Sequence, residues 1–202
     1  MKGISKTKKA LKSEESQRCE DAARELGGEY YKIWKVLRYS GCHPRVVMPY
    51  DYFDKKSPFK EYGMKEEINE AGLVILQWNR PKKRGAKAYT SVPKLEQIDF
   101  IVEDWMREIR ARKSHYKQSV RYAQDLLKVI GAKAGVEGLS PLSLRHTLCV
   151  DLALSGLRES VICDTYNITP SVLKTYVRMR DTQRDSIVLN ALNGLYGKKT
   201  MP

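Results

Sequence analysis

Apolar side chains recur every three or four residues along most of this chain, a spacing that places them on one face of an α-helix. In residues 29–39, for example, Tyr30, Ile33, Trp34 and Leu37 share such a face. The same periodicity predicts further helices over residues 13–26, 95–112, 119–134 and 187–195, and on both sides of a polar break at residues 166–170.

Residues that cap helices support these boundaries. Ser13 is a predicted N-cap, Pro141 stands at a predicted helix start, and Gly41 and Gly135 follow predicted helix ends. The clearest amphipathic pattern lies in residues 95–112, whose predicted inner face consists of Ile98, Ile101, Val102, Trp105 and Ile109.

Two short runs have a different pattern, rich in branched and aromatic residues. They are LVILQW at residues 73–78 and AYTSV at residues 88–92, and they predict the strands of a β-hairpin. The segment between them, residues 79–87, forms a basic tip that carries Arg80, Lys82, Lys83, Arg84 and Lys87. The predicted fold class is therefore mainly α (α+β), a helical bundle with a small antiparallel β-sheet.

The overall charge indicates a polyanionic partner. The chain of 202 residues carries 37 Lys and Arg against 24 Asp and Glu, a net charge of +13. These cations gather in residues 1–12, in the hairpin tip and in residues 107–117, so we expect the protein to bind double-stranded DNA. No signal peptide or apolar run of membrane-spanning length occurs, so we expect no membrane partner and a cytoplasmic location, on nucleoid, viral or plasmid DNA.

The cysteines do not form a metal-binding pattern. Cys19, Cys42, Cys149 and Cys163 contain no C-x-x-C pair, and the three histidines are scattered. We expect no metal and no other cofactor. Three of these cysteines fall in apolar helical patterns typical of reduced core thiols.

Residues 140–179 carry a recognisable set of motifs: L-R-H-T at 144–147, A-L-S-G at 153–156 and L-K-T-Y at 173–176. Together they resemble the catalytic core of the tyrosine recombinase (phage integrase) family. The resemblance matches Arg145 to the family's second catalytic arginine and Tyr176 to its nucleophile. It extends over about residues 13–195, without the separate N-terminal DNA-clamping domain that most of the family carries.

The resemblance implies a specific reaction. Tyr176 would attack a DNA phosphodiester to form a 3′-phosphotyrosine, Arg145 would bind the non-bridging oxygens, and no metal would be needed. A lysine of the hairpin tip would protonate the leaving 5′-oxygen, with Lys87 or Lys83 as candidates. His146 would brace the fold or accept a proton.

Three positions depart from the family pattern. The family's first arginine follows T-G-x, and the matching run S-G-C-H-P-R at residues 40–45 places His43 there, with Arg45 two residues later. The histidine expected three positions before Arg145 is Leu142, which offers no hydrogen bond. The histidine of the family's L-G-H box is replaced by Asn167, which can donate one neutral hydrogen bond.

The resemblance to the family divides the chain into three expected segments. We expect a basic flexible arm at residues 1–12, a recombinase-like catalytic domain at 13–185, and a helix and tail at 186–202 that could dock on a neighbouring protomer. The protein would then associate with itself on DNA.

A second interpretation needs no catalysis. Residues 159–178 also have the pattern of a helix-turn-helix, in which Lys174 and Arg178 would face DNA and Tyr176 would only pack or contact phosphate. The hairpin residues Lys82, Lys83, Arg84 and Lys87, together with Arg45, would contact DNA in either case. A third interpretation, an RNA-binding accessory protein, is supported only by the charge.

Overall fold

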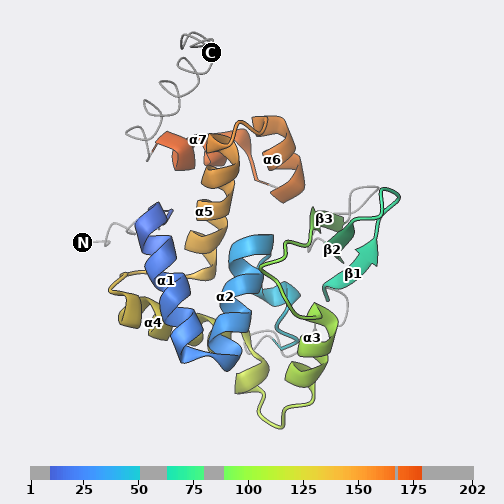
Figure 1. Ribbon diagram of the computed structural model, residues 1–202, viewed down its shortest axis with the longest axis vertical. Helices are drawn as coiled ribbons and strands as arrows, with labels where there is room; N and C mark the ends of the chain where they lie inside the picture. The colour runs from blue at the N-terminus through green and yellow to red at the C-terminus, as the bar shows by residue number, and fades with distance from the viewer. Residues whose placement is uncertain (1–9, 51–62, 80–88, 167, 179–202) are drawn as a thin grey trace, which may run out of the picture. The chain divides into compact units, whose positions relative to one another are not determined.

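The computed structural model describes residues 10–50, 63–79, 89–166 and 168–178. The chain divides into two compact units, which we call the first unit (residues 1–148) and the second unit (residues 149–202). Figure 1 shows the helices and the small sheet, and each unit is described below by itself.

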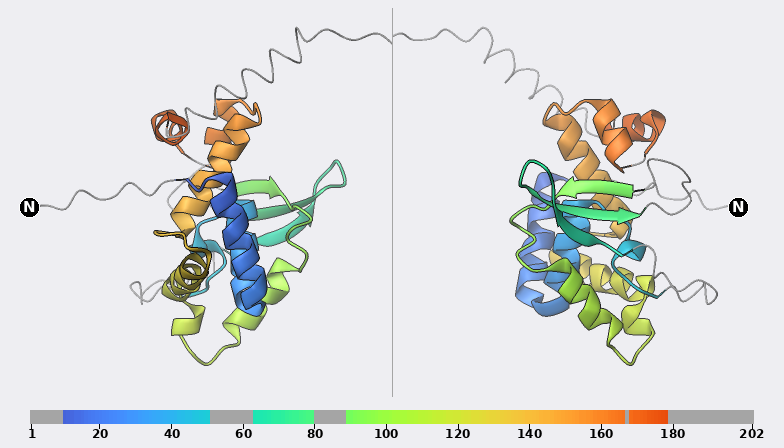
Figure 2. Two further views of the ribbon diagram at one scale, coloured as in Figure 1. Left: turned by 60° about the vertical axis from the view of Figure 1, so that its left-hand side comes forward. Right: turned by 90° about the vertical axis from the view of Figure 1, so that its right-hand side faces the viewer.

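Three helices make up the main helical part of the first unit. Helix α1 (Ser13–Leu26) packs on α2 (Gly28–Ser40) and α4 (Val120–Ala134), and the views in Figures 1 and 2 show α1 beside α4. Trp34 and Leu127 are fully buried among them. The helices predicted from periodicity at these places are therefore confirmed, with ends that differ by at most one residue.

The caps explain where these helices begin and end. Gly41 and Gly135 follow α2 and α4 with φ values of 62° and 66°, a left-handed conformation that glycine adopts without steric cost. The side chain of Ser119 caps α4 by accepting from the N–H of Tyr122 at 3.2 Å. The predicted N-cap at Ser13 is wrong by one position, because Lys12 is the N-cap of α1.

The predicted hairpin is confirmed as part of a three-stranded antiparallel sheet with the order β1-β2-β3. Its strands are β1 (Lys65–Ile68), β2 (Val74–Asn79) and β3 (Tyr89–Pro93), as Figure 2 shows. Trp78 on β2 pairs with Thr90 on β3. The strand β1 was not predicted, because its sequence KEEI has no apolar alternation. The basic tip lies outside the described residues.

Helix α3 (Val102–Arg110) begins seven residues later than the apolar pattern predicts. Glu66 on β1 accepts from the N–H of Val102 at 2.6 Å and pairs with Lys94 at 2.9 Å, while Lys94 also donates to the carbonyl of Phe100. These contacts hold the segment before α3 in a non-helical path. Ile101 is 55% exposed, so its predicted place on the inner face is wrong.

Helix α5 (Pro141–Leu154) has a sharply defined start. The N–H of Ser143 donates to Ser140 Oγ at 3.2 Å, and the N–H of Ser140 donates to Ser143 Oγ at 2.9 Å, a reciprocal cap. Pro141 occupies the first helical turn, as predicted. The N–H of Leu11 donates to Thr147 Oγ1 at 2.8 Å, and Leu11 is buried, so the packed part of the chain already includes Leu11.

The second unit contains two short helices joined by a turn. They are α6 (Glu159–Tyr166) and α7 (Pro170–Arg178), and the fully buried side chains of Ile162 and Leu173 lie in them. The pair of helices expected on either side of the polar break is therefore present. The helix predicted at residues 187–195 lies outside the described residues. Among the helices described, none is long and apolar enough to cross a membrane.

Candidate functional site

Arg145 lies in the second turn of α5, and its side chain is half-buried. The reciprocal cap of Ser140 and Ser143 fixes the start of this helix and so determines the direction in which Arg145 projects. Thr147 lies two residues after Arg145 on the same helix. Its hydroxyl accepts from the N–H of Leu11 and donates to the carbonyl of Ser143, both at 2.8 Å. The guanidinium therefore projects from a helical segment that is held at several points.

Within the first unit, the charge of Arg145 acts on the segment that follows α2. Burial raises the pKa of the Cys42 thiol to about 11, while a hydrogen bond to Ser40 and the positive charge of Arg145 lower it. Cys42 directly precedes His43, so the charge of Arg145 acts on the residue next to this candidate for the first arginine position.

The segment after α2 presents both candidates for the first arginine position. His43 is exposed, and its Nδ1 accepts from the N–H of Arg45 at 3.1 Å, which caps the 3₁₀ helix η1 (Pro44–Val46). Arg45 is half-buried. His43, Arg45 and Arg145 all belong to the first unit, so this part of the predicted site contains two arginines and one histidine.

Two neighbours of Arg145 on α5 have contrasting environments. His146 is 5% exposed and lies in the packed interior. Leu142 is 46% exposed and lies one turn before Arg145 on the same side of the helix. The position at which the family has a histidine is thus open to solvent but holds an apolar side chain.

The remaining predicted residues lie elsewhere. In the second unit, α7 contains Lys174, whose side chain is exposed, and the backbone positions of Tyr176 and Arg178. Tyr166, the other tyrosine near the break, is 7% exposed and packs in this unit. The predicted residues Asn167, Lys82, Lys83, Arg84 and Lys87 lie outside the described residues.

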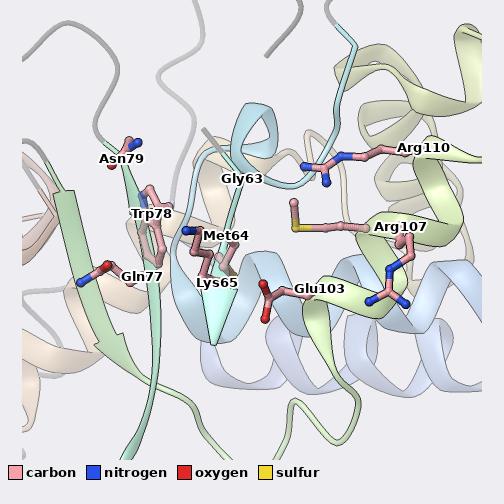
Figure 3. Close-up of a pocket in the computed structure, with 10 residues that line it drawn as sticks. Gly63, Met64, Lys65, Gln77, Trp78, Asn79, Glu103, Arg107 and Arg110 are labelled. Carbon is pink, nitrogen blue, oxygen red and sulfur yellow. The ribbon is translucent and has the colours of Figure 1, made fainter. Parts of the chain in front are cut away.

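The structure also contains a hollow that the sequence pattern does not predict. It has a volume of about 510 Å³ and lies between β1, β2 and α3 (Figure 3). Arg107 and Arg110 belong to the basic segment noticed in the sequence, but Lys65 lies on the strand that was not predicted. In the described part of the chain, no cluster of three or more His, Cys, Asp or Glu side chains could hold a metal ion.

Solved structures of recombinases are similar to this chain. A XerH site-specific recombinase bound to its difH substrate matches 91% of the chain with a TM-score of 0.64 at 13% identity, and 53% of the XerH chain is covered. XerA recombinase matches 93% with a TM-score of 0.58 at 17% identity, covering 65% of XerA. The Tn1549 transposon integrase, bound to circular-intermediate DNA, matches 87% with a TM-score of 0.53 at 14% identity, covering 64% of that chain.

The fold is therefore that of the tyrosine recombinase catalytic domain, and the resemblance seen in the sequence is confirmed at the level of the fold. The chain spans between about half and two thirds of the length of these recombinases. No protein-family model matches the sequence, and no curated protein matches it.

Proposed function

We propose that this protein binds double-stranded DNA and belongs by function to the recombinase and integrase class. The observation that supports this most directly is the fold, which is shared with a XerH recombinase bound to its substrate and with the Tn1549 integrase bound to DNA. The net charge of +13 supports the same partner.

The proposed reaction is strand cleavage and rejoining. Tyr176 Oη would attack a phosphodiester phosphorus, the bond to the 5′-oxygen would break, and a 3′-phosphotyrosine would remain on the protein. Arg145 would hold the non-bridging oxygens with its planar, permanently charged guanidinium, so that negative charge developing there is stabilised. The 5′-hydroxyl of a second strand would then attack the phosphotyrosine and release Tyr176.

The other predicted residues take supporting roles in this proposal. Lys87 or Lys83 would donate the proton to the leaving 5′-oxygen, and Asn167 would donate a neutral hydrogen bond to the phosphate. His43 or Arg45 would replace the family's first arginine. Lys82, Arg84, Lys174 and Arg178 would contact the DNA backbone, and association of protomers would take place on the DNA.

A non-catalytic DNA-binding function is the second candidate, and one observation favours it. The exposed Leu142 stands one turn from Arg145, where a hydrogen-bonding side chain would be needed for the reaction of the family. A protein that had lost cleavage would keep the fold and the basic surfaces, and its α6-turn-α7 segment could serve as a helix-turn-helix.

A covalent-adduct assay separates these two functions. The protein would be incubated with a random-sequence library of nicked duplexes and then run on a denaturing gel. The nick traps the covalent protein–DNA product, because the short strand released by cleavage diffuses away and cannot be rejoined. A DNA-linked band in the parent that is absent in Tyr176→Phe supports catalysis at Tyr176. Binding without any adduct supports the second function, and adduct in Tyr176→Phe would place the nucleophile elsewhere.

DNA binding itself is measured by titration at several salt concentrations. Each phosphate neutralised by the protein contributes about 0.9 to the slope of log K against log salt. A steep slope is expected for a chain with this charge. A slope near zero would contradict both candidate functions, since each requires contact with the DNA backbone.

A further inference from the structure

The end of the sheet at which β1 turns into β2 carries apolar side chains that the fold leaves exposed. Ile68, the last residue of β1, is 74% exposed, and Val74, the first residue of β2, is 42% exposed. Leu73, which directly precedes β2, is 56% exposed. Figure 2 shows the turn between these two strands extending away from the helices of the first unit.

Local hydrogen bonds hold this turn in its shape. Asn69 Oδ1 accepts from the N–H of Ala71 at 3.1 Å and from the N–H of Leu73 at 2.9 Å. The N–H of Gly72, which has a φ of 76°, donates to the carbonyl of Asn69 at 2.9 Å. The turn therefore forms without burying the side chains of Ile68 and Leu73, so the fold itself does not explain why these positions are apolar.

Backbone pairing brings further exposed apolar residues to the same place. Ile68 lies directly opposite Val74 in the register of β1 and β2, so their side chains share one face of the sheet. The N–H of Lys94 donates to the carbonyl of Val74 at 2.9 Å. The next residue, Leu95, is also exposed, and it therefore lies beside the first residue of β2.

The segment before α3 extends this exposed surface. Its N–H at Val102 donates to the carboxylate of Glu66, which lies on the same face of β1 as Ile68. The exposed Ile101, which directly precedes Val102, therefore lies near the base of the turn. These side chains form a surface that we call the apolar patch: Ile68, Leu73, Val74, Leu95 and Ile101. Exposed apolar patches of this kind mark sites of interaction with other molecules.

Carboxylates surround the apolar patch. Residues 66–74 contain three Asp or Glu and residues 95–104 contain four, whereas neither segment contains Lys or Arg. Three of the seven pair with cations of other segments: Glu66 with Lys94, Asp99 with Lys35 and Asp104 with Arg107. Glu67, Glu70 and Glu96 are exposed and form no ion pair within the described part of the chain. We call these three carboxylates the acidic rim, which stands out in a chain with a net charge of +13.

We infer that the apolar patch and the acidic rim together bind a cationic, amphipathic segment of another protein. The apolar side chains of such a segment would cover the patch, and its Lys and Arg side chains would meet the rim. The same rim repels a polyanion, so DNA is not the molecule that covers this surface. The inference does not depend on the proposed function, and it uses none of the residues proposed for strand cleavage.

Two variants of the full chain test the two parts of the surface, each with a matched control. Ile68→Thr removes an exposed apolar side chain but keeps the branched Cβ that suits a strand, and Val129→Thr makes a similar change at an exposed position of α4. Glu70→Lys reverses one charge of the rim, and Glu137→Lys reverses an exposed charge elsewhere in the first unit. Thermal unfolding of each variant shows whether its fold is intact.

The probes are three labelled synthetic peptides of equal length, and their binding is measured by fluorescence anisotropy. The first combines Leu and Lys at helical spacing, the second has Glu in place of Lys, and the third has Ser in place of Leu. The Leu–Lys peptide should bind the parent more tightly than the other two. Ile68→Thr and Glu70→Lys should each weaken its binding about tenfold, whereas both controls should stay within about twofold of the parent.

Three results would overturn the inference. The first is equal binding of the Leu–Lys peptide, or no binding, in the parent, Ile68→Thr and Glu70→Lys. The second is equally tight binding of the Leu–Glu peptide, which would show that the rim does not select for charge. The third is self-association of the parent in light scattering that disappears in Ile68→Thr, because a second copy of this chain would then cover the patch. DNA binding by the parent is measured separately, and its loss would count against the proposed function alone.

Discussion

His43 Nδ1 accepts a hydrogen bond of 3.1 Å from the N–H of Arg45, so the two candidates for the missing first arginine are joined through one turn of backbone. An imidazole nitrogen that accepts a hydrogen bond carries no proton, so in this arrangement only Nε2 of His43 could act as a donor. It can offer one donor to a phosphate, where arginine would offer a charged pair.

Replacing His43 by arginine should therefore increase the rate of DNA cleavage, if the protein cleaves. We expect an increase of about tenfold or more, because a single donor in such a site contributes about 100-fold or more in other enzymes. The measurement is the initial rate of adduct formation on a nicked duplex.

Two further variants show what His43 itself contributes. His43→Asn keeps a side-chain acceptor for the N–H of Arg45, and His43→Ala removes it. If His43 acts on the phosphate, His43→Ala should cleave more slowly than the parent while its thermal stability falls by only a few degrees. Equal rates in both variants and the parent would assign the first arginine position to Arg45, and Arg45→Gln would then be the decisive variant.

Leu142→His should also increase cleavage. The new side chain would stand one turn before Arg145 on a surface that is already 46% exposed, so it should cost little stability. It would supply a hydrogen-bond donor at the position where the resemblance expects one. Leu142→Ala, which changes the size without adding a donor, is the control, and an equal rate in both variants would contradict the prediction.

The ion pair between Lys35 and Asp99 predicts an acid-sensitive contribution to stability. Lys35 is 4% exposed, and its Nζ lies 2.7 Å from Asp99 Oδ2 and 3.9 Å from the centre of the Tyr31 ring. The hydrogen bond from Lys35 lowers the pKa of Asp99 below its usual value. A carboxylate with a lowered pKa stabilises the folded state above its unfolded pKa of about 3.9, and this contribution is lost as the pH falls through the folded pKa.

Asp99→Asn should consequently destabilise the protein at neutral pH by about 1 kcal/mol, since a buried ammonium loses its anionic partner. The value is kept low because the Asp99 side chain is 66% exposed and water replaces part of the interaction. Lys35→Met, which removes the buried charge, should cost less and should flatten the dependence of stability on pH below about 5. Urea unfolding at several pH values measures both effects, and a larger loss in Lys35→Met would contradict this explanation.

The cysteines should differ in reactivity toward iodoacetamide in the folded protein. Burial raises the pKa of Cys19 and of Cys42 to about 11, and Cys149 is fully buried. Cys163 is only half-buried, although burial raises its pKa as well. Cys163 should therefore be alkylated first at pH 8, because its sulfur can be reached.

Mass spectrometry of the partly modified protein identifies the site. Cys19, Cys42 and Cys149 should be modified only after urea unfolds the chain. Early modification of Cys42 in the folded protein would show that the segment between α2 and η1 opens to solvent.

The sequence by itself determined those elements that depend on neighbouring residues. The apolar spacing from Tyr30 to Leu37 and the glycine at position 41 were enough to predict α2 and its end, because a helix and its cap involve contacts within a few residues. The same holds for the hairpin of β2 and β3. The motifs around Arg145 and Tyr176 indicated the recombinase fold, which the solved structures confirm, whereas the roles of these residues remain predictions.

Tertiary contacts decided the rest. The strand β1 has too few apolar residues to be predicted, and it forms by antiparallel pairing with β2. Glu66 also bonds to Lys94 and to the N–H of Val102, partners that lie about thirty or more residues away. The same contacts delay the start of α3 beyond its apolar pattern. The electrostatic effect of Arg145 on Cys42 and the contact of Arg110 with Gly63 likewise join distant parts of the chain. Hydrophobic periodicity describes one helix or strand at a time, so contacts between residues distant in the sequence could be known only from the folded structure.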